Sequence, residues 1–189
     1  MIIELAVGAA ATAAAAYILR RIRDRRAPPP QEAGPPKPTG PRGLRVGDVL
    51  LYASEELWLA GMIELREEGE FIARLFQTPG SDHADWVVQL DPDAKDLALL
   101  KNTDVLPAGR VPAELRVQGI LHNLMKRGTA TLRAEGDDLR AAASGEFTFL
   151  SGTAGRVIVF VDGKGDERIA ACGERVPAEM LDFLPGDAD

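Results

Sequence analysis

The chain has 189 residues, of which 46% are hydrophobic and 27% charged, as expected for one globular domain with appendages. Its single cysteine excludes an intramolecular disulfide and a zinc site of several thiolates, and its two histidines exclude most histidine-rich metal sites. The net charge of −7 divides into +4 for residues 1–42 and −11 for residues 43–189, so the larger part lacks a basic face and we expect no nucleic-acid partner.

The N-terminus opens with an apolar run of 18 residues, Ile2 to Leu19, whose one charge is Glu4. As a helix this run would span about 27 Å, close to the ~30 Å hydrocarbon core of a bilayer. Five arginines follow within residues 20–26, and positively charged flanks stay in the cytoplasm. Residues 1–26 are therefore predicted to be a single-pass transmembrane helix of a bacterial inner membrane, with the N-terminus outside and membrane contact through residues 2–19.

Two alternatives to the membrane anchor are a cleaved signal peptide and a soluble or surface-lying helix. Alanine makes up eight of the 18 residues and favours insertion only weakly, whereas arginines directly after the run oppose translocation. Small residues at every fourth position would also allow close packing of two helices, which makes a homodimer through Gly8, Ala10 and Ala14 a further hypothesis.

A proline-rich stretch, residues 27–42, contains seven of the 13 prolines. Such a stretch forms neither a helix nor a sheet ladder and favours extended polyproline II. We expect it to be a semi-rigid linker between the anchor and residues 43–189.

Residues 43–189 are predicted to be a β-rich domain, because short apolar runs alternate with turn residues. Weak internal parallels at offsets of 58 and 71 residues suggest two similar small antiparallel lobes, barrel- or sandwich-like, over residues 43–106 and 107–186. The expected strands are Val46–Tyr52, Leu57–Leu65, Phe71–Phe76, Trp86–Leu90, Leu97–Leu100, Glu146–Leu150 and Val157–Val161.

The secondary structure of residues 114–125 is open at this point. Val117, Ile120, Leu121, Leu124 and Met125 have helical spacing between Pro112 and Gly128. The parallel with residues 56–63 favours a strand instead. One short helix is expected over residues 137–143.

Several landmarks of residues 43–186 resemble the uncharacterised bacterial domain of unknown function 4178. They are the opening Leu44 to Val49, the motifs Val117-x-Gly119 and Arg127-Gly128-x-Ala130, Gly136-Asp137, and the ending from Ala171 to Gly186. Trp86 stands where such domains tend to have an aromatic residue. The resemblance implies a β fold and supplies no catalytic residue.

The most polar cluster is Ser81-Asp82-His83-Ala84-Asp85, in which two carboxylates flank an imidazole. Asp82, His83 and Asp85 could bind a divalent cation or serve a small-molecule or metal-dependent hydrolase. A turn after Pro79-Gly80 explains the same residues without chemistry.

Other reactive residues and glycine-rich loops are given structural interpretations. His122 is expected to be a hydrogen-bonded histidine at a strand edge and Cys172 a buried, reduced thiol. The loop at 162–166 is interpreted as a hairpin turn, because it lacks the pattern of a phosphate-binding loop. The loop at 67–70 is interpreted in the same way, with its acidic residues keeping the tip solvated rather than binding a cation.

The sequence therefore favours a membrane-anchored cytoplasmic domain that is a non-enzymatic binding or scaffolding module for an unknown protein partner. No catalytic, cofactor-binding or metal-binding residue is assigned. The alternative is the hydrolase that would use Asp82, His83 and Asp85.

Overall fold

The structure is a computed structural model that describes residues 44–90, 92, 96–104, 109–136, 139, 141–163, 168–184 and 186. The predicted transmembrane helix over residues 1–26 and the linker over residues 27–42 lie outside these residues. Within the described ranges, the search for a helix of sufficient length and hydropathy to cross a membrane finds none.

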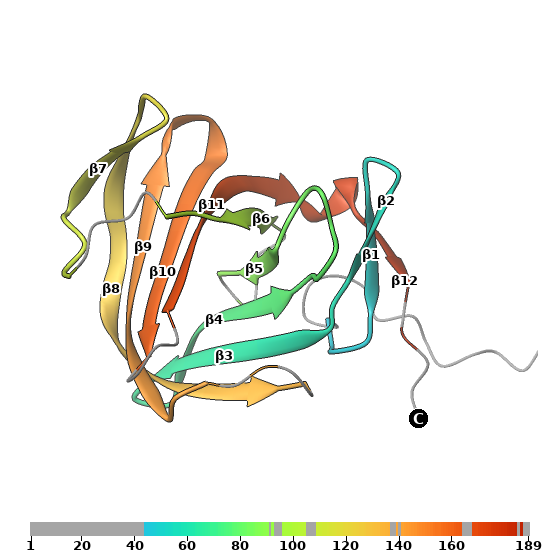
Figure 1. The fold of residues 1–189 in the computed structure, drawn as a ribbon, viewed down its shortest axis with the longest axis horizontal. Helices are drawn as coiled ribbons and strands as arrows, with labels where there is room; N and C mark the ends of the chain where they lie inside the picture. Colours follow the sequence, from blue (N-terminus) through green and yellow to red (C-terminus); the bar gives the residue numbers. More distant parts are fainter. Residues whose placement is uncertain are drawn as a thin grey trace, which may run out of the picture. The chain divides into compact units, whose positions relative to one another are not determined.

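Eight antiparallel strands close into a barrel (Figure 1). Around the barrel the order is β3-β4-β5-β6-β11-β10-β9-β8, and the pairing of β8 with β3 completes the circle. The barrel strands are β3 (Gly61–Glu67), β4 (Glu70–Gln77), β5 (Trp86–Gln89), β6 (Asp96–Asn102), β8 (Ile120–Glu135), β9 (Ser144–Gly152), β10 (Arg156–Gly163) and β11 (Arg168–Pro177).

The remaining strands lie outside the barrel. β7 (Glu114–Val117) pairs with the first residues of β8. β1 (Val49–Tyr52), β2 (Glu55–Trp58) and β12 (Asp182–Leu184) form a separate three-stranded sheet, in the order β12-β1-β2. Two short 3-10 helices, Thr153–Gly155 and Ala178–Met180, follow β9 and β11.

The interior of the barrel is a packed hydrophobic core. On β10, Val157, Val159 and Val161 point inward, and the rings of Phe147 and Phe149 on β9 lie 5.3 Å apart between their centroids. Apolar side chains from all eight strands fill the space between them, as in other small barrels.

Two further clusters cover parts of the outer surface. The inner face of the small sheet, with Leu50 and Leu57, packs against Phe76, Val87 and Leu99 of the barrel. The second cluster joins apolar residues of the β6–β7 connection and β7 to the outer faces of β9 and β10, and consists of Val111, Val117, Leu150, Ile158 and Phe160.

The expectation of a mainly β, antiparallel fold is confirmed, whereas the division into two lobes, 43–106 and 107–186, is not found. β3–β6 from the first proposed lobe and β8–β11 from the second form two contiguous halves of one closed barrel. The pairs β3–β8 and β6–β11 join these halves, so they share one core rather than forming two separate lobes.

Residues 114–125 form strands and a turn, not a helix. β7 ends at Val117, and Gln118 and Gly119 have positive φ of 51° and 81° before β8 begins. This turn type matches the twist of a tight hairpin. In the parallel segment, β2 ends at Trp58 and β3 starts at Gly61 in a different sheet, so the expected strand Leu57–Leu65 is two strands that do not pair with each other. The helix expected over 137–143 falls partly outside the described residues, and Leu139 and 141–143 are not helical.

Candidate functional site

An open groove of about 920 Å³ runs along the outer face of β8, β9 and β10. The side chains that line it belong to outward-facing positions of these strands, because the neighbouring positions fill the barrel core. The segment 109–111, from the connection between β6 and β7, forms the opposite wall. The polar residues of the groove are Arg110, Arg127, Thr129, Ser144, Glu146, Thr148 and Asp162.

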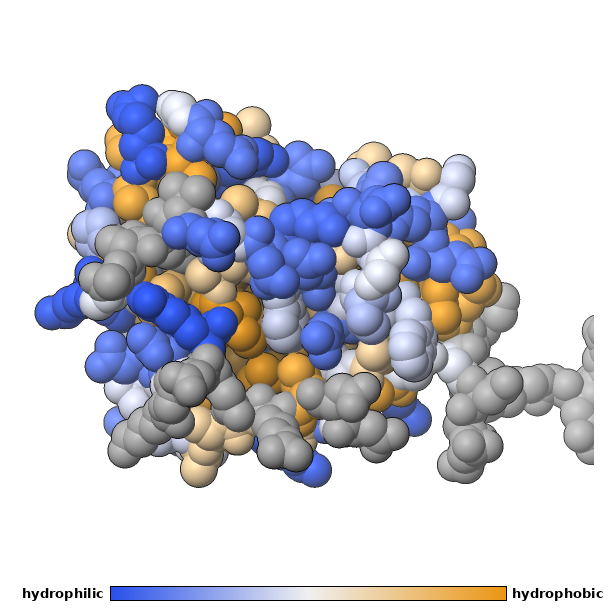
Figure 2. Space-filling model, in the orientation of Figure 1, coloured by the Kyte–Doolittle hydropathy of each residue, from blue (hydrophilic) through white to orange (hydrophobic). Residues whose placement is uncertain are grey.

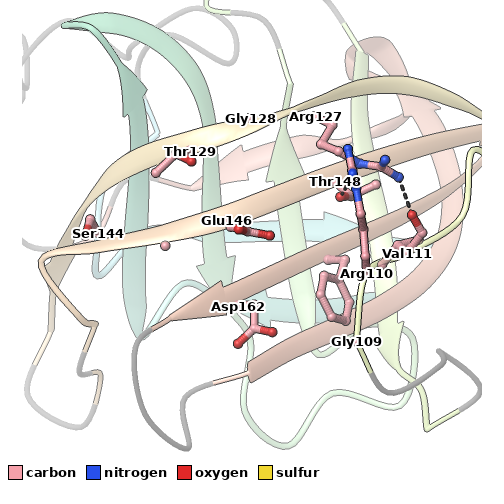
Figure 3. A pocket seen from close by; sticks show the side chains of 12 residues that line it. Gly109, Arg110, Val111, Arg127, Gly128, Thr129, Ser144, Glu146, Thr148 and Asp162 are labelled. Atoms are coloured by element: carbon pink, nitrogen blue, oxygen red, sulfur yellow. Dashed lines mark hydrogen bonds between the residues drawn. The ribbon is translucent and has the colours of Figure 1, made fainter.

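Two carboxylates lie side by side in the groove. Glu146 on β9 and Asp162 on β10 are directly paired positions of the antiparallel ladder. Figure 3 shows both side chains directed into the groove from adjacent strands. Like charges at such a position destabilise a sheet by a few tenths to about 1 kcal/mol. Arg168 offsets this for Asp162 at 3.9 Å, whereas no residue in the described ranges forms an ion pair with Glu146.

Two arginines lie on the other side of the groove (Figure 3). Arg127 holds the wall in place, since its guanidinium donates hydrogen bonds to the Val111 and Pro112 carbonyl oxygens and to the Thr148 hydroxyl, the last at 3.3 Å. Arg110 is exposed and has no ion pair with a described residue. The groove thus has a positive side, an acidic side and several hydroxyl groups.

Phe160 forms part of the floor and is only 4% exposed. The Arg168 guanidinium lies 4.3 Å from the centre of its ring, which fixes that arginine beside Asp162. Phe160 and Arg168 also border a second depression of about 460 Å³ that reaches the end of β6. The floor of the groove is therefore a buried aromatic ring covered by an arginine side chain.

The residues of the Ser81–Asp85 cluster make contacts with two neighbouring strands. The Asp82 N–H donates to Glu55 Oε1 at 2.6 Å, and the His83 imidazole pairs with the same carboxylate. Asp85 accepts a hydrogen bond from the Asn102 N–H at 2.8 Å and lies 3.3 Å from Lys101 Nζ. These contacts fasten the loop between β4 and β5 to β2 and to β6.

The electrostatics of this loop agree with a structural role. A hydrogen bond with the Ser81 side chain lowers the pKa of the Glu55 carboxyl, and the Asp82 N–H and the charge of His83 act in the same direction. Glu55 is therefore ionised near neutral pH and holds the loop. Among the described residues, no group of three or more His, Cys, Asp or Glu side chains is arranged to hold a metal ion.

The remaining reactive residues lie apart from the groove. His122 is buried, and its Nδ1 lies 3.0 Å from the Ile120 carbonyl oxygen, as a hydrogen-bonded histidine requires; it sits between β7 and β9 rather than at a sheet edge. Cys172 is a free thiol on the outer face of β11 and is half-buried rather than buried. It borders a depression of about 270 Å³ together with His83 and Lys101.

Sequence reasoning missed Glu146 and Asp162 as a pair. Glu146 is the first residue of an expected strand, and alternation alone would place it outward, whereas Asp162 belongs to the expected hairpin turn 162–166. The signal that joins them is the register of β9 against β10, which the sequence pattern does not specify. Arg127 gave a weak signal as part of the Arg127-Gly128 landmark.

Comparisons of the chain with protein-family models, with curated proteins and with solved structures find no match in any of the three. The resemblance to the domain of unknown function 4178 therefore stays a prediction, and the geometry of the groove is the basis for a functional proposal.

Proposed function

We propose that this chain is a non-enzymatic binding module whose outer groove takes a segment of a protein partner. The observation that carries the proposal is the carboxylate pair of Glu146 and Asp162 on adjacent strands of an open groove, in which Glu146 has no ion pair with a described residue. A lysine or arginine side chain inserted between the two carboxylates would relieve their repulsion and gain charge-assisted hydrogen bonds. An acidic or carbonyl group of the same segment would meet Arg110.

The proposal includes the place of the module in the cell. It is membrane-anchored through residues 2–19, with the arginine-rich flank and the folded domain in the cytoplasm and a homodimer through Gly8, Ala10 and Ala14 as an option. The support is the length of the apolar run and the arginines that follow it. Residues 27–42 would hold the domain away from the bilayer as a linker. We also propose that residues 43–186 belong to the bacterial domain of unknown function 4178, on the basis of their shared landmark residues.

The hydrolase alternative rests on Asp82, His83 and Asp85. It has less support, because His83 and Asp85 already have charged partners in Glu55 and Lys101. A nucleophile or general base would have to break these contacts before it could act.

Site-specific photo-crosslinking in cells tests the proposal. A photoreactive amino acid replaces Arg110 in the full-length chain, and the same replacement at the exposed turn residue Glu68 is the control. We expect a discrete adduct with one protein, in the membrane fraction, from position 110 only. The adduct should be lost when Glu146→Gln and Asp162→Asn are added. An adduct that persists in this double variant, or equal adducts at both positions, would refute groove binding.

A further inference from the structure

The outer face of the small sheet carries an exposed apolar row across its three strands. Val49 of β1 is paired with Leu184 of β12 on one side and with Trp58 of β2 on the other. Leu50, Leu57 and Phe183 are the next positions along these strands and pack against the barrel, so the row must face away from it. Trp58 is 53% exposed and Leu184 43%.

This row differs from an isolated surface leucine. A tryptophan, a leucine and a valine lie side by side on neighbouring strands, and tryptophan is among the residues that most often anchor protein interfaces. Figure 2 shows hydrophobic residues at the surface over the region of β12 and β1, at the right of the view, beside the mainly hydrophilic surface of the barrel.

A second row on the same face adds negative charge. Leu51 is paired with Asp182 on one side and with Glu56 on the other. Both carboxylates are exposed, and neither forms an ion pair with a described residue. The face thus carries two adjacent rows. One is fully apolar, and in the other Leu51 lies between two acidic side chains. Its charge complements a partner that has apolar side chains bordered by lysine or arginine.

The size of the face limits the shape of that partner. Three strands span about 10 Å between the outer two, and four residues extend about 13 Å along a strand. A second copy of the chain would need roughly 800 Å² per partner for a stable interface, which is several times this area. One α-helix, about 10 Å in diameter, matches it. Strand addition is disfavoured because the edge strands have only three and four residues.

From this geometry we infer that the outer face of the β12-β1-β2 sheet binds a basic amphipathic helix of a partner protein. The apolar side of the helix covers Trp58, Val49 and Leu184, and its lysines or arginines meet Glu56 and Asp182. This surface is separate from the groove on β8–β10, so a single module can hold two segments.

Trp58 itself reports on the proposed contact. The only other tryptophan, Trp86, is buried in the barrel with its Nε1 bonded to Asn102, so changes in emission on binding arise at Trp58. The probe is a synthetic amphipathic helix of leucine and lysine, added to the purified full-length protein. We expect the emission to move to shorter wavelength and the accessibility to acrylamide to fall, with saturation. The matched variant Trp58→Phe should show neither change.

Charge and site controls complete the test. Reversal of both acids, Glu56→Lys with Asp182→Lys, should weaken binding of the leucine-lysine peptide roughly tenfold. The groove variant Glu146→Gln with Asp162→Asn should respond like the wild type, which separates this inference from the proposed function. An equal response to a leucine-glutamate peptide or no response would overturn the inference. So would a shift caused by anionic vesicles alone, or one that depends only on protein concentration.

Discussion

Glu64 shows how a single outward-facing residue is fixed on the barrel. Its side chain on β3 is 8% exposed and receives hydrogen bonds from Arg66 Nε at 2.6 Å and Arg74 Nε at 2.8 Å. Burial raises the pKa of the Glu64 carboxyl, but the two arginines outweigh burial and the net pKa is lowered. The carboxylate is therefore more favourable in the folded chain than in the unfolded chain, and this difference contributes to stability.

The pH dependence of stability follows from that sign. A lowered folded-state pKa gives stability that is complete above the ordinary value of 4.5 and is lost as the pH falls through the folded pKa. Glu64→Gln should lower the free energy of unfolding at pH 7 by about 1 to 2 kcal/mol and make it less sensitive to acid below pH 4.5. Urea unfolding of the wild type and the variant, at pH 7 and at a pH below 4.5, measures both effects. An unchanged acid dependence in the variant would contradict the role of Glu64, and the exposed Glu68→Gln serves as control.

Individual residues were predictable from the sequence where the local pattern alone decides their role. The hairpin turn at Glu68-Gly69 was expected, and both residues have positive φ. The free, reduced state of Cys172 was expected from the lack of a second cysteine, whereas its half-exposure depends on which face of β11 is outside. The fastening of His83 to Glu55 joins positions 28 apart in sequence, so no local pattern could indicate it.

At the scale of elements, the strands with continuous apolar runs were predictable and the others were not. β10 is buried on both faces, and its run Val157–Val161 was recognised. The start of β8 was favoured as a strand by the parallel with residues 56–63, whereas its second half, residues 126–135, was missed. Glycine and alanine occupy core-side positions there: Gly128 is paired with Phe147, and Ala130 lies in the barrel core. β11 was missed because only a few of its residues are large and apolar.

The close approach of β6 and β11 tests the arrangement of the elements. A Cβ on Gly173 would lie 1.9 Å from the Leu99 carbonyl oxygen, so Gly173→Ala requires the two backbones to separate. We expect a loss of about 3 kcal/mol in the free energy of unfolding, at the upper end of the cost of overpacking. Glu174→Ala, the next residue and exposed, should change it by less than about 0.5 kcal/mol. Equal effects of both substitutions in denaturant unfolding would contradict the register of β6 against β11.

For the whole molecule, closure of the barrel was beyond the reach of the sequence pattern. The expectation of two lobes rested on the weak internal parallels, and strands adjacent in sequence do pair within each half of the barrel. The pairs that close the circle instead join Ile63 with Ala134 and Leu100 with Gly173, about 70 residues apart in each case. Strand periodicity specifies which side chains point inward but not which distant strands meet. The groove depends on the register of β9 against β8 and β10, and the apolar face on the pairing of β1 with β2 and β12, so neither could be located from the sequence.

The filled barrel presents two chemically different outer surfaces. The groove offers an acidic pair and Arg110, which is exposed and has no ion pair with a described residue, and the small sheet offers an apolar row with acidic flanks. Surfaces that combine apolar and charged groups in this way suit the binding of protein segments.

Quantitative mass spectrometry of co-purified proteins tests this account most directly. Three full-length versions are compared: the wild type, the groove variant Glu146→Gln with Asp162→Asn, and the charge-matched control Glu68→Gln with Glu114→Gln, whose residues are exposed and outside the groove. We expect one or a few defined proteins at equal levels with the wild type and the control, and at least tenfold less with the groove variant. Equal recovery from all three would contradict the claim that the groove binds a protein partner.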